Sequence, residues 1–533
     1  MSETKGFFKS EKFYFLLFVL MACAGVIFNL PYAYDKLITY DSSYQYFLTQ
    51  HSWQEIWRLL PEDYSPPLYA MLLKLSCTIF GHTLKVMMFT NSIVIVGLVF
   101  IALFPMRRAF GTRTAIVAAF FFICSTVNSS LFREIRPTYW AYLFLTGTAV
   151  YAYLAFFGGK KKDIICHGIF SLLAMYTHNV AMIGVLGIYI LLVICSLIKK
   201  DRKKFLTFFI SGAICGLLYI PWLLIVLKQF GNVKDHYWIA EDAKFSFIKD
   251  NLYNIIFFSR FTDSVPMIAE SVFSLAIKII IFIFLIKNLC IKKGMTLADL
   301  KKAPLFSKEM RTRYFKGIFV ILLLIIPVGA FVILTKTLYP MSAVRYYYIF
   351  TGLTIMIISV LCVKLEKKIM PFFLCALTAA NAAAVHYDMH KHYTNNASNI
   401  ERIIEMVETD NPDGDISFLH SHEWTLGVMS YYFPNAKHYM CDGSWTVLND
   451  LTVFPNVPIE LGDEDNIKEH TDSFYVFNQS IINSTDEIDL KKHFNEADGF
   501  ECLYTKGFIN SDLIPSRIIL TRVKVNDEAE ETE

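Results

Sequence analysis

Long apolar runs recur along most of the chain and alternate with short polar or basic segments. A helix needs about 20 mostly apolar residues to cross the hydrocarbon core of a bilayer, so each run of that kind predicts a membrane span. We place the runs at residues 13–33, 85–105, 113–130, 137–157, 163–178, 179–198, 205–228, 267–287, 316–335, 346–363 and 369–387. The pattern predicts a polytopic α-helical membrane protein with about 11 transmembrane helices.

The pattern changes near residue 388, where the chain becomes polar. Short strand-like runs (DISFLHS, AKHYMC, SFYVFNQ, RIILTRVKV) then alternate with helix-like runs (HEWTLGVMSYYF, TDEIDLKKHF), and the last residues are acidic. This alternation is typical of a small α/β domain. We therefore expect a transmembrane domain at 1–387 and an α/β domain with an acidic tail at 388–533. Cys441 and Cys502 both belong to the second domain and could pair.

Basic clusters mark one face of the membrane. They occur in every second loop, on the side of the N-terminus, at Arg107, Arg108 and Arg113, at Lys160–Lys162, at 199–204, at 287–316, and at Lys364, Lys367 and Lys368. Positive charge in short loops is typical of the cytoplasmic side. The protein is therefore predicted to be a multi-pass protein of the cell membrane with a cytoplasmic N-terminus and an extracytoplasmic C-terminal domain.

The composition agrees with a membrane protein, since 55% of the 533 residues are hydrophobic and 16% are aromatic. The net charge of +3 says little about partners, and we expect no nucleic-acid partner. We find no nucleotide-binding glycine loop, zinc-type Cys/His spacing or Ser-His-Asp signature. An enzyme fed by cytoplasmic nucleotide sugars would be expected to carry a phosphate-binding loop on the cytoplasmic side.

Charged residues of the opposite face stand out because positive charge is disfavoured there. The first outer loop, 34–84, alternates aromatic and charged residues, which suits short helices lying flat at the interface, and it contains Asp41 and Asp63. The very short loop LFREIRPTYW carries Arg133 and Arg136, whose planar guanidinium groups suit phosphate but could also pair with Glu134.

Two further residues belong to the same face. His178 lies at a tight turn between two apolar runs, where it could bind a ligand or cap a helix. Arg345 opens the run at 346–363, where it could bind a phosphate or extend its guanidinium to the interface. A single explanation covers all these residues: an outer-leaflet site for a lipid-linked phosphate, with carboxylates close by for proton transfer.

The motifs YDSSY, DYSPPLYAMLLKL, REIRPTYW, YTHN and VRYYY follow one another in this order and on one face. In this the chain resembles the membrane glycosyltransferases of the C superfamily, and it is similar to glycosyltransferase family 39, over about residues 10–390. That family includes protein mannosyltransferases and bacterial aminoarabinose transferases. The resemblance implies an enzyme that takes a sugar from a polyprenyl-phosphate carrier and transfers it outside the cytoplasm to a lipid, glycan or protein acceptor.

The resemblance also implies roles for individual residues. Asp41 matches the family's first-loop acid, but Ser42 stands where a Glu usually follows, which weakens the case for a metal there. Asp63 matches the acid before the Pro-Pro-Leu-Tyr run, and Ser65 replaces a residue that is often basic. Phosphate contacts are therefore expected from Arg133, Arg136 and Arg345, with His178 nearby.

Tyrosines of the same motifs, namely Tyr44, Tyr69 and Tyr139, are the expected acceptor or sugar contacts. We assign no cofactor; a divalent metal ion shared by Asp63 with Glu62 or His178 stays open.

Asp41 is the candidate general base in this hypothesis. A polyprenyl phosphate is a good leaving group once its charge is neutralised, so the carrier does not need a strong acid. The acceptor hydroxyl does need a base. Direct attack would invert the anomeric carbon. Two other classes remain open: a lipid or polysaccharide transporter or flippase, which would show mid-span charges and internal duplication, and a non-enzymatic scaffold for cell-surface assembly, which would not need Asp41.

Overall fold

The computed structural model describes most of the chain. The described residues are 10–30, 38–61, 65–132, 134–233, 248–249, 252, 279, 308–337, 343–365, 369–445, 451–454, 459–461, 467–481, 499–509 and 516–526.

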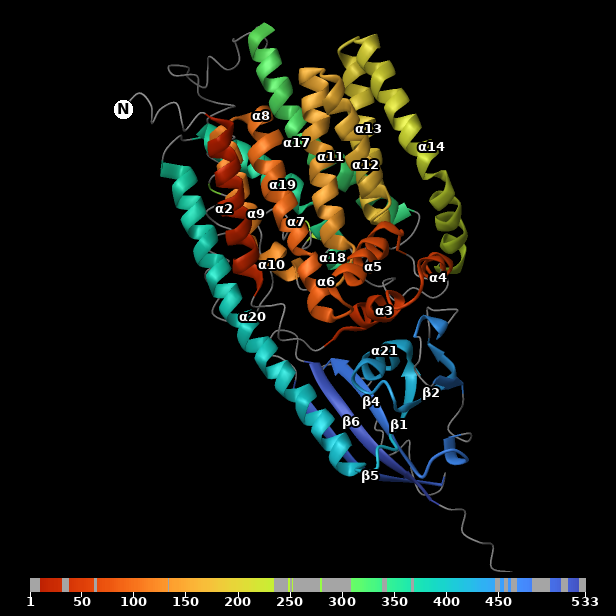
Figure 1. Ribbon diagram of the computed structural model, residues 1–533. Coiled ribbons are helices and arrows are strands. Elements are labelled where there is room, and N and C mark those ends of the chain that lie inside the picture. Colours follow the sequence, from red (N-terminus) through yellow and green to blue (C-terminus); the bar gives the residue numbers. More distant parts are fainter. Residues whose placement is uncertain are drawn as a thin grey trace, which may run out of the picture.

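A bundle of long apolar helices forms the larger part of the described structure (Figure 1). Its helices are α2 (Glu11–Asn29), α6 (Leu84–Thr90), α7 (Ser92–Ile101), η2 (Ala102–Met106), α8 (Arg107–Phe110), α9 (Thr112–Cys124), α10 (Thr126–Phe132), α11 (Thr138–Gly158), α12 (Lys161–Met175), α13 (Asn179–Ile198), α14 (Arg202–Val233), α17 (Lys308–Thr337), α18 (Val344–Tyr348), α19 (Thr351–Leu365) and α20 (Ile369–Asp410). Exposed side chains of α14 such as Leu217, Leu224 and Leu227 are apolar, as expected for a surface that faces lipid.

Six helical stretches among the described residues are long and apolar enough to cross a membrane. They are Glu11–Asn29, Leu84–Phe110, Thr138–Gly158, Asn179–Ile198, Arg202–Gln229 and Phe315–Thr337, and shorter apolar helices cover Leu68–Phe80, Thr112–Cys124 and Thr351–Val363. The predicted polytopic helical class is confirmed. The number of crossings stays a prediction, because the run at 267–287 lies outside the described residues apart from Ile279.

Two predicted spans are divided in the structure, since the run at 346–363 is shared between α18 and α19. The run at 113–130 is not one helix, because Ser125 adopts an extended backbone (φ −68°, ψ 129°) that ends α9, and α10 begins at the next residue. The residues after the break include Asn128, Ser129 and Ser130, all buried, and short polar side chains of this kind compete with helical hydrogen bonds. Hydropathy alone could not reveal the break.

Short helices occupy the described part of the loop at 34–84, as predicted: α3 (Tyr40–Leu48), α4 (Trp53–Leu59) and α5 (Leu68–Phe80). Two of them begin at side-chain caps, since Thr39 accepts a hydrogen bond from the amide of Ser42 and Ser52 accepts one from the amide of Glu55. These helices lie at the end of the bundle that faces the sheet, whereas α8 lies at the opposite end (Figure 1). At that opposite end Arg108 of α8 pairs with the buried Asp163 of α12.

The C-terminal part of the chain is an α/β unit with a six-stranded mixed sheet in the order β3-β2-β1-β4-β6-β5. Its elements are β1 (Ser417–His422), α21 (Glu423–Tyr432), β2 (Lys437–Trp445), η5 (Leu451–Val453), β3 (Ile459–Leu461), β4 (Ser473–Ile481), β5 (Phe500–Ile509) and β6 (Ser516–Val525). The first four strands are parallel to one another, and β6 and β5 add an antiparallel hairpin. The predicted α/β domain is therefore confirmed. The predicted helix TDEIDLKKHF lies outside the described residues.

The sheet order keeps the two cysteines of this unit apart. Cys441 lies in β2 and Cys502 in β5, which stand four strand positions from each other. At about 4.8 Å per strand this places them roughly 19 Å apart, well beyond the Cα separation of a disulfide. Cys502 is a free thiol, so the two do not pair.

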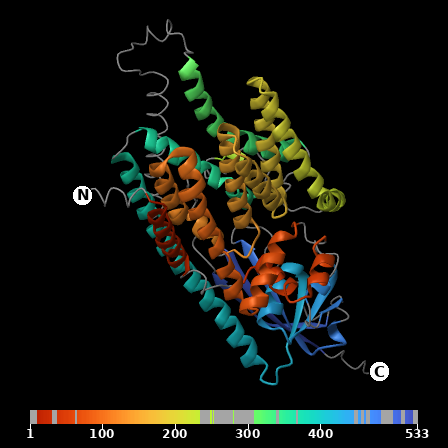
Figure 2. The same ribbon diagram turned by 45° about the horizontal axis from the view of Figure 1, so that its top comes forward.

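Helix α20 joins the bundle to the sheet. It runs unbroken past residue 388 to Asp410, beside the bundle and then along the sheet (Figures 1 and 2). Ile403 and Val407 pack into the same buried cluster as Phe418 of β1. The domain boundary at 387–388 thus falls within a continuous helix, and the division into two domains stays a prediction.

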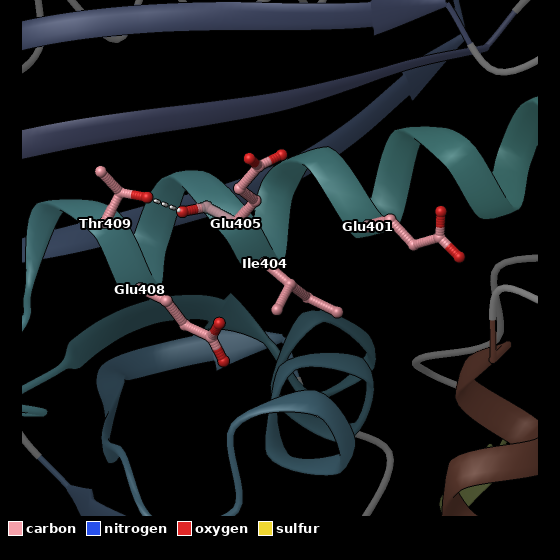
Figure 3. A pocket seen from close by; sticks show the side chains of 5 residues that line it. All are labelled: Glu401, Ile404, Glu405, Glu408 and Thr409. Atoms are coloured by element: carbon pink, nitrogen blue, oxygen red, sulfur yellow. Dashed lines mark hydrogen bonds between the residues drawn. The ribbon is translucent and has the colours of Figure 1, made fainter.

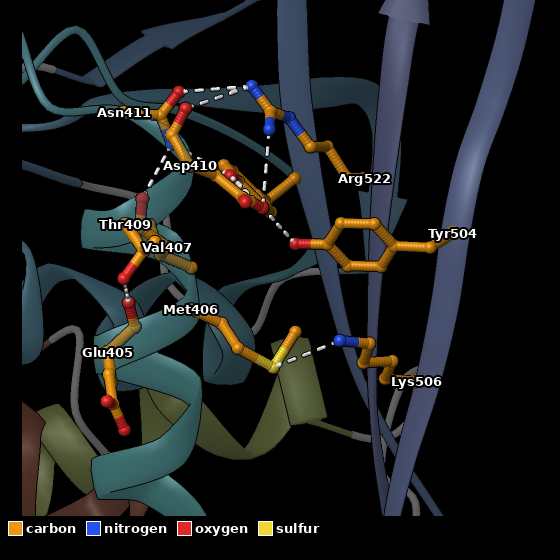
Figure 4. A network of polar contacts seen from close by, with 10 residues as sticks. Glu405, Met406, Val407, Thr409, Asp410, Asn411, Tyr504, Lys506 and Arg522 are labelled. Atoms are coloured by element: carbon orange, nitrogen blue, oxygen red, sulfur yellow. Dashed lines mark hydrogen bonds and ion pairs between the residues drawn. The ribbon is translucent and has the colours of Figure 1, made fainter.

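Polar contacts fasten the end of α20 to the sheet (Figure 4). The carboxylate of Asp410 accepts a hydrogen bond from the Tyr504 hydroxyl at 2.5 Å and pairs with Arg522 at 3.3 Å. The side-chain amide of Asn411 donates to the Val407 carbonyl and to the Tyr475 hydroxyl, each at 2.7 Å. Hydrogen bonds to a charged group are stronger than neutral ones, so this network makes the junction stiff.

A second polar chain holds both ends of α21. The Nε2 atom of His438 lies 3.0 Å from the carbonyl oxygen of Phe433 and must donate to it. Its Nδ1 atom then accepts from Nε2 of His420 at 2.9 Å, and Nδ1 of His420 accepts from the Thr425 hydroxyl at 3.1 Å. Both imidazoles are completely buried and neutral in this arrangement.

This series of hydrogen bonds through two neutral histidines predicts that acid lowers the stability of the protein. Burial lowers the pKa of His438 to about 4, and burial together with His438 lowers the pKa of His420. In the unfolded chain both imidazoles titrate near 6.5, so the unfolded state takes up protons first, and stability present above about pH 6.5 is lost as the pH falls toward 4. We expect a loss of about 3 kcal/mol from His438. The thermal midpoint of the full-length protein should fall with pH less steeply in His438→Gln than in the wild type or in His470→Gln, which changes an exposed histidine. Equal slopes in all three proteins would contradict the prediction.

Candidate functional site

Asp41 lies in the first turn of α3, where the helix dipole favours a negative charge. Its carboxylate Oδ2 accepts a hydrogen bond from Nη2 of Arg136, and the two side chains form an ion pair. The Asp41 side chain keeps 38% of its surface exposed and that of Arg136 keeps 16%. The carboxylate therefore stays reachable while the guanidinium is mostly enclosed.

Arg136 comes from the short connection between α10 and α11. Pro137 follows it as the N-cap residue of α11 with φ −67°, a value that the proline ring fixes. Its observed carboxylate partner is Asp41, which lies 95 residues earlier, rather than the adjacent Glu134 that the sequence left as an alternative.

Arg345 and His178 approach from two other helices. Arg345 lies in α18 with its guanidinium carbon 5.4 Å from the ring centre of Tyr346. His178 is the N-cap residue of α13, and its Nδ1 atom accepts a hydrogen bond from the amide of Val180 at 3.1 Å. The imidazole ring lies edge-on to Tyr346, with ring centres 5.1 Å apart. Tyr346, from the motif VRYYY, thus contacts both residues, and sequence reasoning had given it no role.

Electrostatic interactions join these groups into one cluster. Burial, then the positive charges of Arg345 and Arg136, lowers the pKa of His178 to about 3. Burial and Arg345 also lower the pKa of the Arg136 guanidinium, which stays charged near neutral pH. His178 is therefore neutral near pH 7, and because Nδ1 accepts a hydrogen bond its proton is on Nε2. We refer to Asp41, Arg136, His178 and Arg345 as the outer-face cluster, after the membrane face on which the sequence predicts them.

The outer-face cluster combines two guanidinium groups, a neutral imidazole and one carboxylate. Arg136 interacts electrostatically with Arg345 and pairs with Asp41. Guanidinium groups held close together favour a bound anion. A phosphate is negatively charged, and two of its oxygens can accept the paired N–H groups of a planar guanidinium. The cluster can therefore bind an anion beside a reachable carboxylate.

Comparison with known proteins gives one family match. Residues 64–225 match the family model described as dolichyl-phosphate-mannose-protein mannosyltransferase. The predicted resemblance to family 39 of the C superfamily is confirmed. No curated protein matches the chain.

The fold is similar to that of ArnT from Cupriavidus metallidurans in its crystal structure bound to undecaprenyl phosphate. The TM-score is 0.55 at 11% sequence identity, over 96% of this chain and 98% of that chain. The apo crystal structure of the same ArnT gives a TM-score of 0.41 at 11% identity, over 94% and 97%. The likeness to the first structure establishes that the fold is shared.

The other candidate residues are distributed as follows. Arg133 and Asp63 lie outside the described residues. Tyr44, Tyr69 and Tyr139 are 4%, 1% and 0% exposed. The hydroxyl groups of Tyr69 and Tyr139 have no hydrogen-bond partner within the described part of the chain. Their roles as acceptor or sugar contacts stay predictions.

The described residues do not form a metal site. Among the described residues, no group of three or more His, Cys, Asp and Glu side chains could hold a metal ion. Glu62 and Asp63, which were open as ligands, lie outside that part of the chain.

A shallow groove on α20 has the opposite charge from the outer-face cluster. Figure 3 shows its lining of Glu401, Ile404, Glu405, Glu408 and Thr409, around a volume of about 430 Å³. Three carboxylates and no cation line it, so it would repel a phosphate. The groove is therefore not a second candidate for the carrier.

Proposed function

We propose that this protein is an integral membrane glycosyltransferase that moves a sugar from a polyprenyl-phosphate carrier to an extracytoplasmic acceptor. The observation that carries the proposal is the outer-face cluster, in which the charges of Arg136 and Arg345 act on His178 and Arg136 pairs with Asp41. The match to a mannosyltransferase family model supports it. So does the fold shared with an ArnT whose crystal structure contains undecaprenyl phosphate.

Asp41 acts as the general base in this proposal. The acceptor hydroxyl oxygen attacks the anomeric carbon and loses its proton to the Asp41 carboxylate. The bond between that carbon and the phosphate oxygen breaks, and its electron pair leaves with the carrier phosphate. Attack from the face opposite the phosphate inverts the anomeric carbon, so a β-linked carrier sugar would give an α-linked product.

The cationic residues stabilise the leaving phosphate. Negative charge grows on the phosphate oxygens in the transition state, and fixed donors aimed at that charge lower the barrier. A guanidinium has five N–H groups, so Arg136 can keep its contact with Asp41 while it binds the phosphate. His178 offers a neutral Nε2–H donor that adds no further positive charge.

The proposed orientation places the outer-face cluster and the sheet outside the cytoplasm. The N-terminus would be cytoplasmic, in keeping with the basic loops on its side of the membrane. An acceptor could then be a lipid, a glycan or a protein at the outer surface.

A donor panel tests the reaction class. Purified full-length protein would be incubated with a set of polyprenyl-phosphate sugars, and released carrier phosphate would be measured. We expect release with at least one donor, and release slowed by roughly 10² to 10⁴ in Asp41→Asn. Binding of the carriers without release from any donor would favour a flippase and would contradict the proposal.

A further inference from the structure

Asn91 ties the connection that carries Arg136 to two other helices. It is the single residue between α6 and α7 and is completely buried. Its side-chain amide nitrogen donates to the carbonyl oxygens of Phe132 and Glu134, each at 2.9 Å. Its carbonyl oxygen accepts from the indole nitrogen of Trp140 in α11 at 3.3 Å.

The orientation of this amide is determined by its partners. The indole N–H can only donate and the two backbone carbonyls can only accept, so the amide cannot be flipped without losing all three hydrogen bonds. Phe132 ends α10, where the last carbonyl groups have no partner within the helix. A buried carbonyl without a partner is costly, so Asn91 supplies the donor that the Phe132 carbonyl lacks at the end of α10.

Arg136 is thereby held from both sides. Asn91 fixes the carbonyl of Glu134, two residues before it, and Pro137 fixes the backbone directly after it. Only Ile135 separates the fixed Glu134 from the arginine, and it is itself completely buried. The backbone from which the Arg136 side chain extends is therefore held in place, and its guanidinium meets Asp41.

We propose that Asn91 is a positioning residue, which fixes the connection between α10 and α11 so that Arg136 is aimed at Asp41 and at the carrier phosphate. This inference rests on the proposed function and acts through Arg136 alone. Losing the three hydrogen bonds would let the connection shift, and a displaced Arg136 would bind the carrier less well. The same loss leaves buried polar groups unpaired and destabilises the bundle, so the test has to separate the two effects.

The first test measures the affinity of full-length protein for undecaprenyl phosphate. Asn91→Leu has a similar volume and no hydrogen bonds, and we expect its Kd to rise roughly 10-fold, which is part of the roughly 10- to 150-fold that a lost hydrogen bond to a charged group costs. Trp140→Phe removes only the indole donor and should raise the Kd in the same direction by less, which keeps the test usable if Asn91→Leu folds poorly. Asn411→Leu is the matched control, because Asn411 donates to two acceptors in the same manner at the far end of α20, and its Kd should not change.

A double-mutant comparison separates positioning from general destabilisation. If Asn91 acts through Arg136, Asn91→Leu should add less than threefold to the Kd of Arg136→Ala, since neighbouring groups in one network are not additive. Full multiplication of the two effects, or an unchanged Kd in Asn91→Leu beside a raised Kd in Arg136→Ala, would overturn the inference. An unchanged Kd in Arg136→Ala itself would instead overturn the phosphate role proposed above, so the two failures are distinguishable.

Discussion

Replacing Asp41 by Asn should reduce the rate of sugar transfer by roughly 10² to 10⁴ while carrier binding stays at least as tight as in the wild type. The rate falls because an amide cannot take the proton of the acceptor hydroxyl. Binding persists because the substitution keeps the shape of the side chain and removes a negative charge that competes with the phosphate for Arg136. Single-turnover transfer with a radiolabelled donor would give the rate, and a separate Kd for undecaprenyl phosphate would give the binding.

Asp201→Asn is the matched control for this experiment. Asp201 is a carboxylate paired with Lys204 at 3.2 Å, in the turn between α13 and α14 and away from the outer-face cluster. Its replacement should leave transfer unchanged. Transfer at the native rate in Asp41→Asn would show that another group is the base.

Arg136→Ala should weaken carrier binding by roughly 10- to 150-fold, since a hydrogen bond to a charged group contributes about 1.5–3 kcal/mol. Turnover should fall as well, because the same guanidinium would stabilise the charge that grows on the leaving phosphate. Arg136→Lys should restore only part of the loss, because an ammonium lacks the planar pair of donors. The measurement is the Kd for undecaprenyl phosphate alongside kcat and KM for the best donor.

Arg113→Ala provides the control for net charge. Arg113 is exposed near the start of α9, within the basic cluster predicted to be cytoplasmic, and its loss removes the same charge from the protein. If Arg113→Ala and Arg136→Ala weakened binding equally, the effect would be one of overall charge, and Arg136 would not be a phosphate ligand.

Much of the architecture could be predicted from hydropathy alone. Apolar runs of the right length located the helices of the bundle, and alternating runs located β1, β2, β4 and β6. The strand β5 was missed because FECLYTKGFI mixes polar, charged and glycine residues, and it pairs with β6 only through the hairpin geometry of the folded sheet. The break at Ser125 was missed because apolarity continues across it.

The members of the outer-face cluster could be proposed because the alternation of loops across a membrane assigns distant segments to the same face. That rule places Asp41, Arg136, His178 and Arg345 together, but it cannot say which side chains touch. The ion pair between Asp41 and Arg136 depends on where α3 lies relative to the connection between α10 and α11, which no local pattern encodes. The role of Asn91 could not be predicted for the same reason. An asparagine within an apolar stretch becomes informative only when its hydrogen-bond partners are known, and these lie 41 and 43 residues away.

The C-terminal unit has a physical connection to the cluster as well. Helix α21 packs against α3, and Gly427 makes this close approach possible, because an added Cβ there would lie 2.7 Å from the Ser43 hydroxyl oxygen. The helix that carries Asp41 is thus supported from the side of the sheet.

The most direct measurement is a cryo-electron microscopy structure of the full-length protein in a lipid nanodisc with undecaprenyl phosphate. We predict that the phosphate lies between the guanidinium groups of Arg136 and Arg345, within hydrogen-bond distance of both, with the Asp41 carboxylate beside it. A phosphate bound elsewhere, with Arg136 still paired to Asp41 alone, would contradict the central claim that these residues form the carrier site.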